Sequence, residues 1–372
     1  MIPTLDIVYC FRNKDAKRVK NSLDTLALQT TKNFSVIFID YGSDENIAEQ
    51  TKLLCLNYNF CKYIYVDTQG KIWNRADALN HGFYFSEAEY VFTSDIDMLF
   101  YPNFFEEVLK SLNENEVKFY AVGYLNEKQT NNINIKAITT LKYKKSKNYA
   151  LGMMLVSKNI IKKINGYNSF YAIWGQEDND IKYRIETNGF TTKFEDKKIY
   201  LLHQYHLPAT LTDLPNGWRQ YLTDYFENYK LSKTNFLGLN EINSVTARPA
   251  KKLYFDKNLI YTLLPYRNLF FKHQVINAVN NSTVGNYVAY QFDLNIHKLQ
   301  HSGLQKVSNF LNLVFTKIKL PLQIKSIHLN QYVTKNEIRD EIYFILKSFE
   351  NCIQDYYLQI TTTTIKLIIV KK

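Results

Sequence analysis

The feature that most restricts the fold is an alternation of short apolar runs and helical patterns over roughly the first 235 residues. The expected elements are strands at 5–11, 34–40, 62–67, 90–94, 117–125 and 151–157, and helices at 15–28 and 74–85. Alternating strands and helices form crossover units, which predicts an α/β fold with a mainly parallel central sheet flanked by helices. Ligands of such sheets bind at the carboxyl ends of the strands.

The pattern changes after about residue 240, where the alternation ends. The expected elements are strands at 287–295 and 322–330, helices at 302–315 and 335–353, and a terminal strand or hairpin at 356–370. We therefore predict two domains, an α/β domain over 1–240 and a smaller α+β domain over 241–372, whose role the sequence does not indicate.

The net charge of +11 favours an anionic partner, such as a nucleotide or a phospholipid surface. No nucleic-acid motif accompanies this charge, so nucleic acid is not an expected partner. The four cysteines have neither CxxC nor disulfide-framework spacing, and no apolar run is long enough to cross a bilayer. Together these features predict a cytoplasmic protein.

Two carboxylates follow the predicted strand at 90–94, in the stretch "FTSDIDM". Asp95 and Asp97 are two residues apart at a strand end, where they could share a divalent cation and a bound phosphate. Aspartate before a turn is also common because it caps local backbone N–H groups. The pair alone leaves both interpretations open.

Two later stretches favour the metal site. "WGQED" places Trp174 and Gly175 directly before Glu177 and Asp178, at the start of a predicted helix, where acidic residues also serve as caps. "LLHQYH" then offers His203 and His206 at a strand end. A neutral imidazole beside a carboxylate pair completes a mixed oxygen and nitrogen site that suits Mn²⁺.

Five motifs in order resemble the β-1,4-galactosyltransferase family, a group of glycosyltransferases with the GT-A nucleotide-sugar-binding fold. They are "FRNK" (11–14), "WNRADALNHGF" (73–83), "FTSDIDM" (92–98), "INGY" (164–167) and "WGQEDNDI" (174–181). "IDYGSDE" (39–45) also resembles bacterial chondroitin-polymerase-type transferases. The resemblance covers about residues 5–206.

The resemblance implies a donor site and a metal site. The donor, a UDP-sugar, is expected at Arg12, Asn13, Asp40, Arg75, Asp95 and Tyr149. Tyr149 aligns with a position that helps to separate galactose from N-acetylgalactosamine donors and favours galactose. The ion, Mn²⁺ or Mg²⁺, is expected at Asp97, His203 and Asp95, of which Asp95 contacts ribose or a metal-bound water, and His206 is the alternative to His203.

The resemblance also implies the acceptor side and the reaction. Asp178 corresponds to the general base, Glu177 to a neighbouring residue that helps to hold the acceptor, and Trp174 with Gly175 to the segment that closes over the sugars. The expected reaction is metal-dependent, inverting transfer of a sugar, with galactose favoured, to a hydroxyl of a saccharide acceptor. Gln176 replaces a glycine of the family motif, which is expected to alter the loop and not the chemistry.

Three alternatives remain at this point. The donor could be UDP-N-acetylgalactosamine or UDP-N-acetylglucosamine. The acceptor could be a free or a lipid-linked saccharide, and a lipid-linked one would bring the chain to the inner face of the membrane, with peripheral contact, in polysaccharide or glycolipid synthesis. A non-catalytic saccharide- or nucleotide-binding module is a different class, which the intact Asp178 disfavours because binding alone needs no base.

Overall fold

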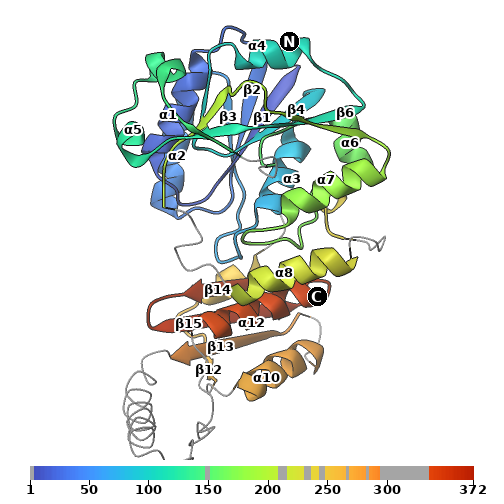
Figure 1. The fold of residues 1–372 in the computed structure, drawn as a ribbon. Helices are drawn as coiled ribbons and strands as arrows, with labels where there is room; N and C mark the ends of the chain where they lie inside the picture. Colours follow the sequence, from blue (N-terminus) through green and yellow to red (C-terminus); the bar gives the residue numbers. More distant parts are fainter. Residues whose placement is uncertain are drawn as a thin grey trace, which may run out of the picture. The chain divides into compact units, whose positions relative to one another are not determined.

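The computed structural model describes residues 4–146, 151–207, 216–229, 236–242, 248–264, 268–281, 285–293 and 335–372. The chain forms two compact units (Figure 1). The first comprises residues 1–69, 73–214 and 219–245, and the second comprises 70–72, 215–218 and 246–372. The change at 245/246 lies near the predicted boundary, but two short earlier segments group with the second unit.

The strands of the first unit belong to two sheets. They are β1 (Leu5–Phe11), β2 (Phe34–Asp40), β3 (Cys61–Tyr65), β4 (Tyr90–Ser94), β5 (Met98–Phe100), β6 (Glu116–Tyr120), β7 (Val122–Tyr124), β8 (Lys144–Lys145), β9 (Met154–Ser157), β10 (Thr191–Glu195) and β11 (Leu201–His203). The helices are α1 (Ala16–Ala27), α2 (Glu45–Leu56), α3 (Arg75–Phe85), α4 (Phe104–Lys110), α5 (Glu127–Asn131), α6 (Lys158–Lys163), α7 (Glu177–Thr187) and most of α8 (Asn216–Tyr229). In the described part of this unit, 3₁₀ helices are at Ile135–Thr140 and Leu239–Glu241.

The main sheet has the strand order β10-β6-β9-β4-β1-β2-β3. All of its neighbouring strands are parallel except β9, which runs antiparallel to both β4 and β6. The predicted α/β fold with a mainly parallel sheet is therefore confirmed. In register, Phe11 pairs with Asp40 and Asp40 with Tyr65, so β1, β2 and β3 end level at one edge.

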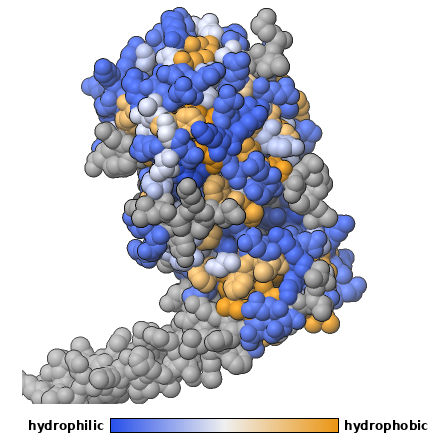
Figure 2. All heavy atoms as spheres, turned by 90° about the vertical axis from the view of Figure 1, so that its right-hand side faces the viewer, coloured by the Kyte–Doolittle hydropathy of each residue, from blue (hydrophilic) through white to orange (hydrophobic). Residues whose placement is uncertain are grey.

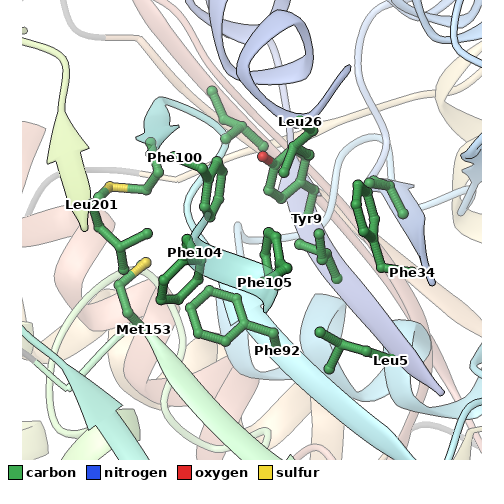
Figure 3. Close-up of a cluster of buried hydrophobic side chains, with 14 of the residues drawn as sticks. Leu5, Tyr9, Leu26, Phe34, Phe92, Phe100, Phe104, Phe105, Met153 and Leu201 are labelled. Atoms are coloured by element: carbon green, nitrogen blue, oxygen red, sulfur yellow. The ribbon is translucent and has the colours of Figure 1, made fainter. Parts of the chain in front are cut away.

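Helices and loops bury both faces of this sheet (Figure 1). Tyr9 of β1 packs in one cluster with α1, whereas its neighbour Val8 packs in the other with α3 and α7. Figure 3 shows the first cluster, in which Phe92, Phe104 and Phe105 gather in edge-on contacts. Burial of such rings is a large part of what stabilises a core. The sheet edge is therefore held by packed layers on both sides.

The small sheet has the order β5-β11-β7-β8. The sequence predicted one strand over 117–125, but the chain breaks at Ala121, so that β6 joins the main sheet and β7 the small one. The break is stabilised by backbone bonds from Tyr120 to Met153 and from Ala121 to Glu195. The predicted strand at 151–157 begins at Met154.

The strands that the structure describes in the second unit form a four-stranded sheet, of order β12-β13-β15-β14. Its elements are β12 (Thr262–Leu263), β13 (Tyr287–Asp293), β14 (Ile353–Ile360), β15 (Thr364–Lys371), α9 (Pro249–Tyr254), α10 (Asn268–Asn281) and α12 (Lys335–Ser348). Of the two possibilities for the terminal segment, the chain forms the hairpin β14–β15. The predicted helix at 302–315 and strand at 322–330 lie outside the described residues.

Among the helices that the structure describes, none is both long and apolar enough to cross a bilayer. On the face drawn in Figure 2, hydrophilic side chains are interspersed with smaller groups of apolar ones.

Candidate active site

The loops after β1, β2 and β3 meet at the carboxyl edge of the main sheet. Arg12, directly after β1, donates to the carbonyl and hydroxyl oxygens of Thr68, at 3.1 and 2.8 Å. Its guanidinium lies over the rings of Tyr41 and Trp73, at 4.9 and 5.7 Å. A cation fixed beside two rings is suited to a flat, negatively charged ligand. Neither ring was among the predicted donor-site residues.

Asn13 joins the first two loops. It has a positive φ of 49° and exchanges hydrogen bonds with Asp44, receiving one from the backbone N–H and donating one to the carboxylate. Asp40 lies beneath this turn, fully buried, where it accepts from the backbone N–H of Ser43 and from the hydroxyl of Tyr63. Burial raises its pKa, and these hydrogen bonds oppose the rise. The structure thus gives Asp40 a role in shaping the turn, while its donor contact stays a prediction.

Arg75 connects Asp95 with Asp178. The residue begins α3, where the side chain of the N-cap Asn74 accepts from a backbone N–H. Its Nε lies 3.4 Å from Asp95, and its Nη1 donates to Asp178 at 3.0 Å. Its Nη2 donates to the carbonyl of Gly152 at 3.2 Å. Two acidic residues some eighty positions apart in the sequence therefore meet at one guanidinium.

Glu177 is buried beside this group. It accepts a hydrogen bond from the backbone N–H of Gly175 at 2.9 Å. Burial and then the charge of Asp178 raise the pKa of Glu177 to about 7, although Arg75 acts in the opposite direction. A carboxyl group that titrates near neutrality can hold or release a proton under physiological conditions.

The loop before α7 has an uncommon backbone. Ile173, Gly175 and Gln176 have positive φ angles of 73°, 119° and 70°. For a β-branched residue such as Ile173 this region is disfavoured, and such strain persists only where surrounding contacts hold it. Trp174 is 44% exposed, which leaves its indole accessible to a ligand.

Helix α8 supplies two contacts that hold this loop. Arg219 places its guanidinium over the ring of Trp174, at 4.6 Å. Gln176 donates to the hydroxyl of Thr223 at 3.2 Å. Gln176, which replaces the glycine of the family motif, thus gives the loop a fixed attachment.

Asp97 is the centre of a second group. Its side chain is only 8% exposed, against 45% for Asp95. It lies 3.3 Å from Arg18, 3.6 Å from His203 and 3.4 Å from His206. A buried carboxylate needs such partners, because its charge is costly away from water.

The small sheet explains why the histidines reach Asp97. β11 pairs antiparallel with β5, which puts His203 opposite Met98, the residue after Asp97. One ligand atom from each of Asp97, His203 and His206 lies within 4.8 Å of the others, close enough to surround one divalent ion. His203 and His206, which the sequence offered as alternatives, thus both lie beside Asp97. Asp95 is not in this group and contacts Arg75 instead.

Besides Tyr41 and Trp73, sequence reasoning missed Arg18, Gly152 and Arg219. Arg18 contacts Asp97 from the first turn of α1, and this contact depends on how α1 packs on β5. Gly152 and Arg219 follow no recognisable motif. Tyr149, the predicted donor-selectivity residue, lies outside the described residues.

Comparisons with known proteins show which class of enzyme this part of the chain is similar to. Residues 6–171 match the model of glycosyl transferase family 2. An uncharacterized glycosyltransferase of Rickettsia felis is 32% identical over 109 residues, which are 29% of this chain and 17% of that protein. Hyaluronan synthase of Streptococcus pyogenes is 28% identical over 133 residues, which are 35% of this chain and 32% of that protein. The chain thus spans less than a third of the length of each of these relatives.

One solved structure, GalNAc-T7 with UDP, GalNAc and Mn²⁺, aligns over 63% of this chain and 52% of its own, at 15% identity and a TM-score of 0.43. That score is too low to bear on the site. The family match nevertheless confirms the predicted enzyme class, since the matched region extends from β1 to β9 and contains all six predicted donor-site residues. The N-terminal part of the chain is a glycosyltransferase domain with the GT-A fold.

Proposed function

We propose that this domain transfers a sugar from a UDP-sugar, with galactose favoured, to a hydroxyl of a saccharide acceptor, with a divalent ion and with inversion at the anomeric carbon. The observation that carries the proposal is the contact of Arg75 with both Asp95 and Asp178. Direct displacement needs the donor sugar and the proton acceptor held close together, and this contact keeps the proposed base Asp178 one side chain away from Asp95, which is proposed to contact the donor's ribose.

On the acceptor side, Asp178 is proposed to accept the proton of the attacking hydroxyl. Arg75 holds one of its oxygens at 3.0 Å, and the side chain remains partly exposed. Glu177 fixes the start of the helix through the N–H of Gly175 and is proposed to help to hold the acceptor. The exposed ring of Trp174 offers a stacking surface for a sugar and would exclude water from the reacting centre.

On the donor side, Arg12 and Asn13 are proposed to hold the nucleotide, with Tyr41 and Trp73 flanking it. The cation of Arg12 is already oriented by Thr68, so little side-chain freedom would be lost on binding. Asp95, exposed at its strand end, is proposed to contact the ribose.

The residues around Asp97 fit a divalent ion, which Asp97, His203 and His206 would hold. When bound, such an ion neutralises charge that develops on the leaving diphosphate. Mg²⁺ takes oxygen ligands almost exclusively, so the two imidazoles favour Mn²⁺ of the two expected ions. The Nδ1 of His206 lies 2.8 Å from the carbonyl of Leu207, which is consistent with a proton there and a free Nε2 toward Asp97.

The acceptor is proposed to be a growing saccharide, free or lipid-linked. The similarity to a hyaluronan synthase supports polysaccharide synthesis, and the net charge of +11 supports contact with an anionic membrane surface. A flotation assay with vesicles of phosphatidylglycerol against vesicles of phosphatidylcholine would test the membrane contact. If the protein binds neither kind of vesicle, the free saccharide remains as the acceptor class.

The proposal is tested by a donor screen with UDP release as the readout, with and without Mn²⁺. UDP-galactose is expected to give the fastest release, and UDP-N-acetylgalactosamine or UDP-N-acetylglucosamine is the alternative outcome. Release should fall when Mn²⁺ is omitted. If no UDP-sugar reacts, even with water, the proposed activity is wrong.

A non-catalytic binding module is separated from the enzyme by Asp178→Asn. This change keeps the shape of the side chain but removes the proton acceptor. The enzyme is expected to lose transfer by about 100-fold or more while UDP binding, followed by calorimetry, stays within a few-fold of the native value. A module would show no transfer in either form.

A further inference from the structure

Gln204 lies between the two candidate histidine ligands in the sequence, and its side chain is completely buried. We infer that Gln204 is a positioning residue for the metal site, which fixes Asp97 relative to His203 and His206. This inference rests on the proposed function, because it assigns a role toward the ion proposed there.

The hydrogen bonds of Gln204 use every polar group of its side chain. Its Nε2 donates to the backbone carbonyls of Asp97 and Arg18, at 3.1 and 3.0 Å. Its Oε1 accepts from the side-chain amide of Asn21 at 2.8 Å. The side chain thus touches the turn that holds Asp97 and the helix that holds Arg18.

The backbone of Gln204 also contacts the turn that holds Asp97. Its N–H also donates to the carbonyl of Asp97, at 3.1 Å, and continues the pairing of β11 with β5 past His203. One residue therefore joins the three segments that supply the Asp97 group: α1, the turn after β4, and the end of β11. Ligating side chains must be held to within about half an ångström for tight binding, and hydrogen bonds that join these segments restrict their relative movement.

A buried glutamine can also serve stability alone, and the chain offers a matched example. Gln29 is buried and joins α1 to the segment after β5. Its Nε2 donates to the carbonyls of Tyr101 and Thr25, at 2.9 and 3.3 Å, and its Oε1 accepts from the N–H of Phe105 at 3.2 Å. Gln29 does not touch a candidate metal ligand, so it separates loss of stability from loss of positioning.

The experiment compares Gln204→Met with Gln29→Met in the full chain. Methionine has a similar length but no amide, so each variant removes the side-chain hydrogen bonds to two backbone carbonyls, although the Asp97 carbonyl keeps the bond from the backbone N–H of residue 204. Both variants are expected to unfold at a lower temperature than the native protein. Only Gln204→Met is expected to weaken Mn²⁺ binding, measured by electron paramagnetic resonance of free Mn²⁺, by about 10-fold or more.

Asn21→Ala is a second variant for the case that Gln204→Met does not fold. Asn21 is partly exposed, and its loss frees only the Oε1 end of Gln204, so the fold is expected to persist and Mn²⁺ binding to weaken several-fold. Native Mn²⁺ affinity in the folded variants, or equal weakening in Gln29→Met, would overturn the inference. A native protein that binds no Mn²⁺ would instead overturn the proposed metal site itself.

Discussion

The guanidinium of Arg75 lies 3.0 Å from the carboxylate of Asp178. Arg75 is largely buried, so its charge requires compensation, and Asp178 and Asp95 supply it. Burial alone would lower the pKa of Arg75, but these carboxylates outweigh it and hold the guanidinium protonated. Arg75 is thus a permanent cation between the proposed base and the proposed ribose-binding group.

Arg75→Lys is expected to lower transfer by about 100-fold, because a single ammonium cannot reach both Asp95 and Asp178 as the fork of the guanidinium does. Steady-state UDP release with a saturating donor measures the effect. Arg184→Lys is the control, because Arg184 forms a similar partly buried pair with Asp180 on α7, at 2.8 Å. Arg184→Lys is expected to lower the stability of the protein, while its transfer activity stays within a few-fold of the native value. Equal loss in both variants would mean that α7 is only destabilised.

Glu177→Gln is expected to change stability in a pH-dependent way. The folded-state pKa of Glu177 is raised from 4.5 to about 7, so the folded state binds the proton more tightly than the unfolded state. Stability is therefore lost as the pH rises through this range, by up to about 3 kcal/mol above pH 7. The variant removes this cost, so in denaturant unfolding its stability should exceed that of the native protein near pH 8 and match it near pH 4, below the unfolded-state pKa.

Glu186, in the last turns of the same helix, provides a control because its pKa is shifted in the opposite direction. Burial opposes its ionisation, but hydrogen bonds from Lys182 and Thr192 outweigh this and lower its pKa. Its contribution is present above the unfolded pKa and is lost as the pH falls through the folded pKa. Glu186→Gln should therefore be less stable than the native protein at neutral pH. A gain near pH 8 in both variants would refute the assignment for Glu177.

Much of the fold followed from hydrophobic periodicity, because both faces of a parallel sheet are buried and its strands read as apolar runs. β1 has the bounds that the sequence indicated, Leu5–Phe11. The break at Ala121 could not be read in the same way, since the run 117–125 stays apolar across it. β6 makes its last pairing with Glu195 of β10, and Val122 then pairs with Leu201 of β11, so the break depends on partners more than seventy residues away.

The site was predictable where its residues belong to motifs and less so elsewhere. Asp95, Asp97, Asp178 and the histidines were indicated by residue type and spacing, and the structure brings them into two groups. Arg18 was missed because a basic residue on an exposed-looking helix face resembles ordinary surface. Its contact with Asp97 depends on how α1 packs on β5, which is tertiary information.

Replacing either histidine near Asp97 is expected to weaken Mn²⁺ binding. His203 and His206 both reach this carboxylate, at 3.6 and 3.4 Å, so neither should substitute fully for the other. His203→Gln and His206→Gln should each lower the affinity for Mn²⁺ by about 10-fold or more, as measured by calorimetry. His81→Gln, on α3, should leave it unchanged. Weakening in only one of the first two variants would show a site with a single imidazole ligand.

Gly152→Ala tests how closely the side chains pack around Arg75, Asp95 and Asp178. A Cβ on Gly152 would lie 3.3 Å from Arg75 Nη2, 3.7 Å from Asp178 and 3.9 Å from Asp95. Only the contact with Arg75 is too close, and Arg75 can give way only by lengthening its contacts with the two carboxylates. Transfer is therefore expected to fall by about 10-fold, with little change in the unfolding temperature, because the fold is not strained elsewhere.

The measurement is UDP release together with thermal unfolding of the same sample. Gly152→Ser should lower transfer further, since its hydroxyl adds a second atom to the space between Arg75 and Asp178. A Gly152→Ala enzyme with native activity would mean that Arg75 can shift without consequence, and would count against its role in holding the proposed base. Lost activity with a matching loss of unfolding temperature would instead mean that the substitution disturbs the fold.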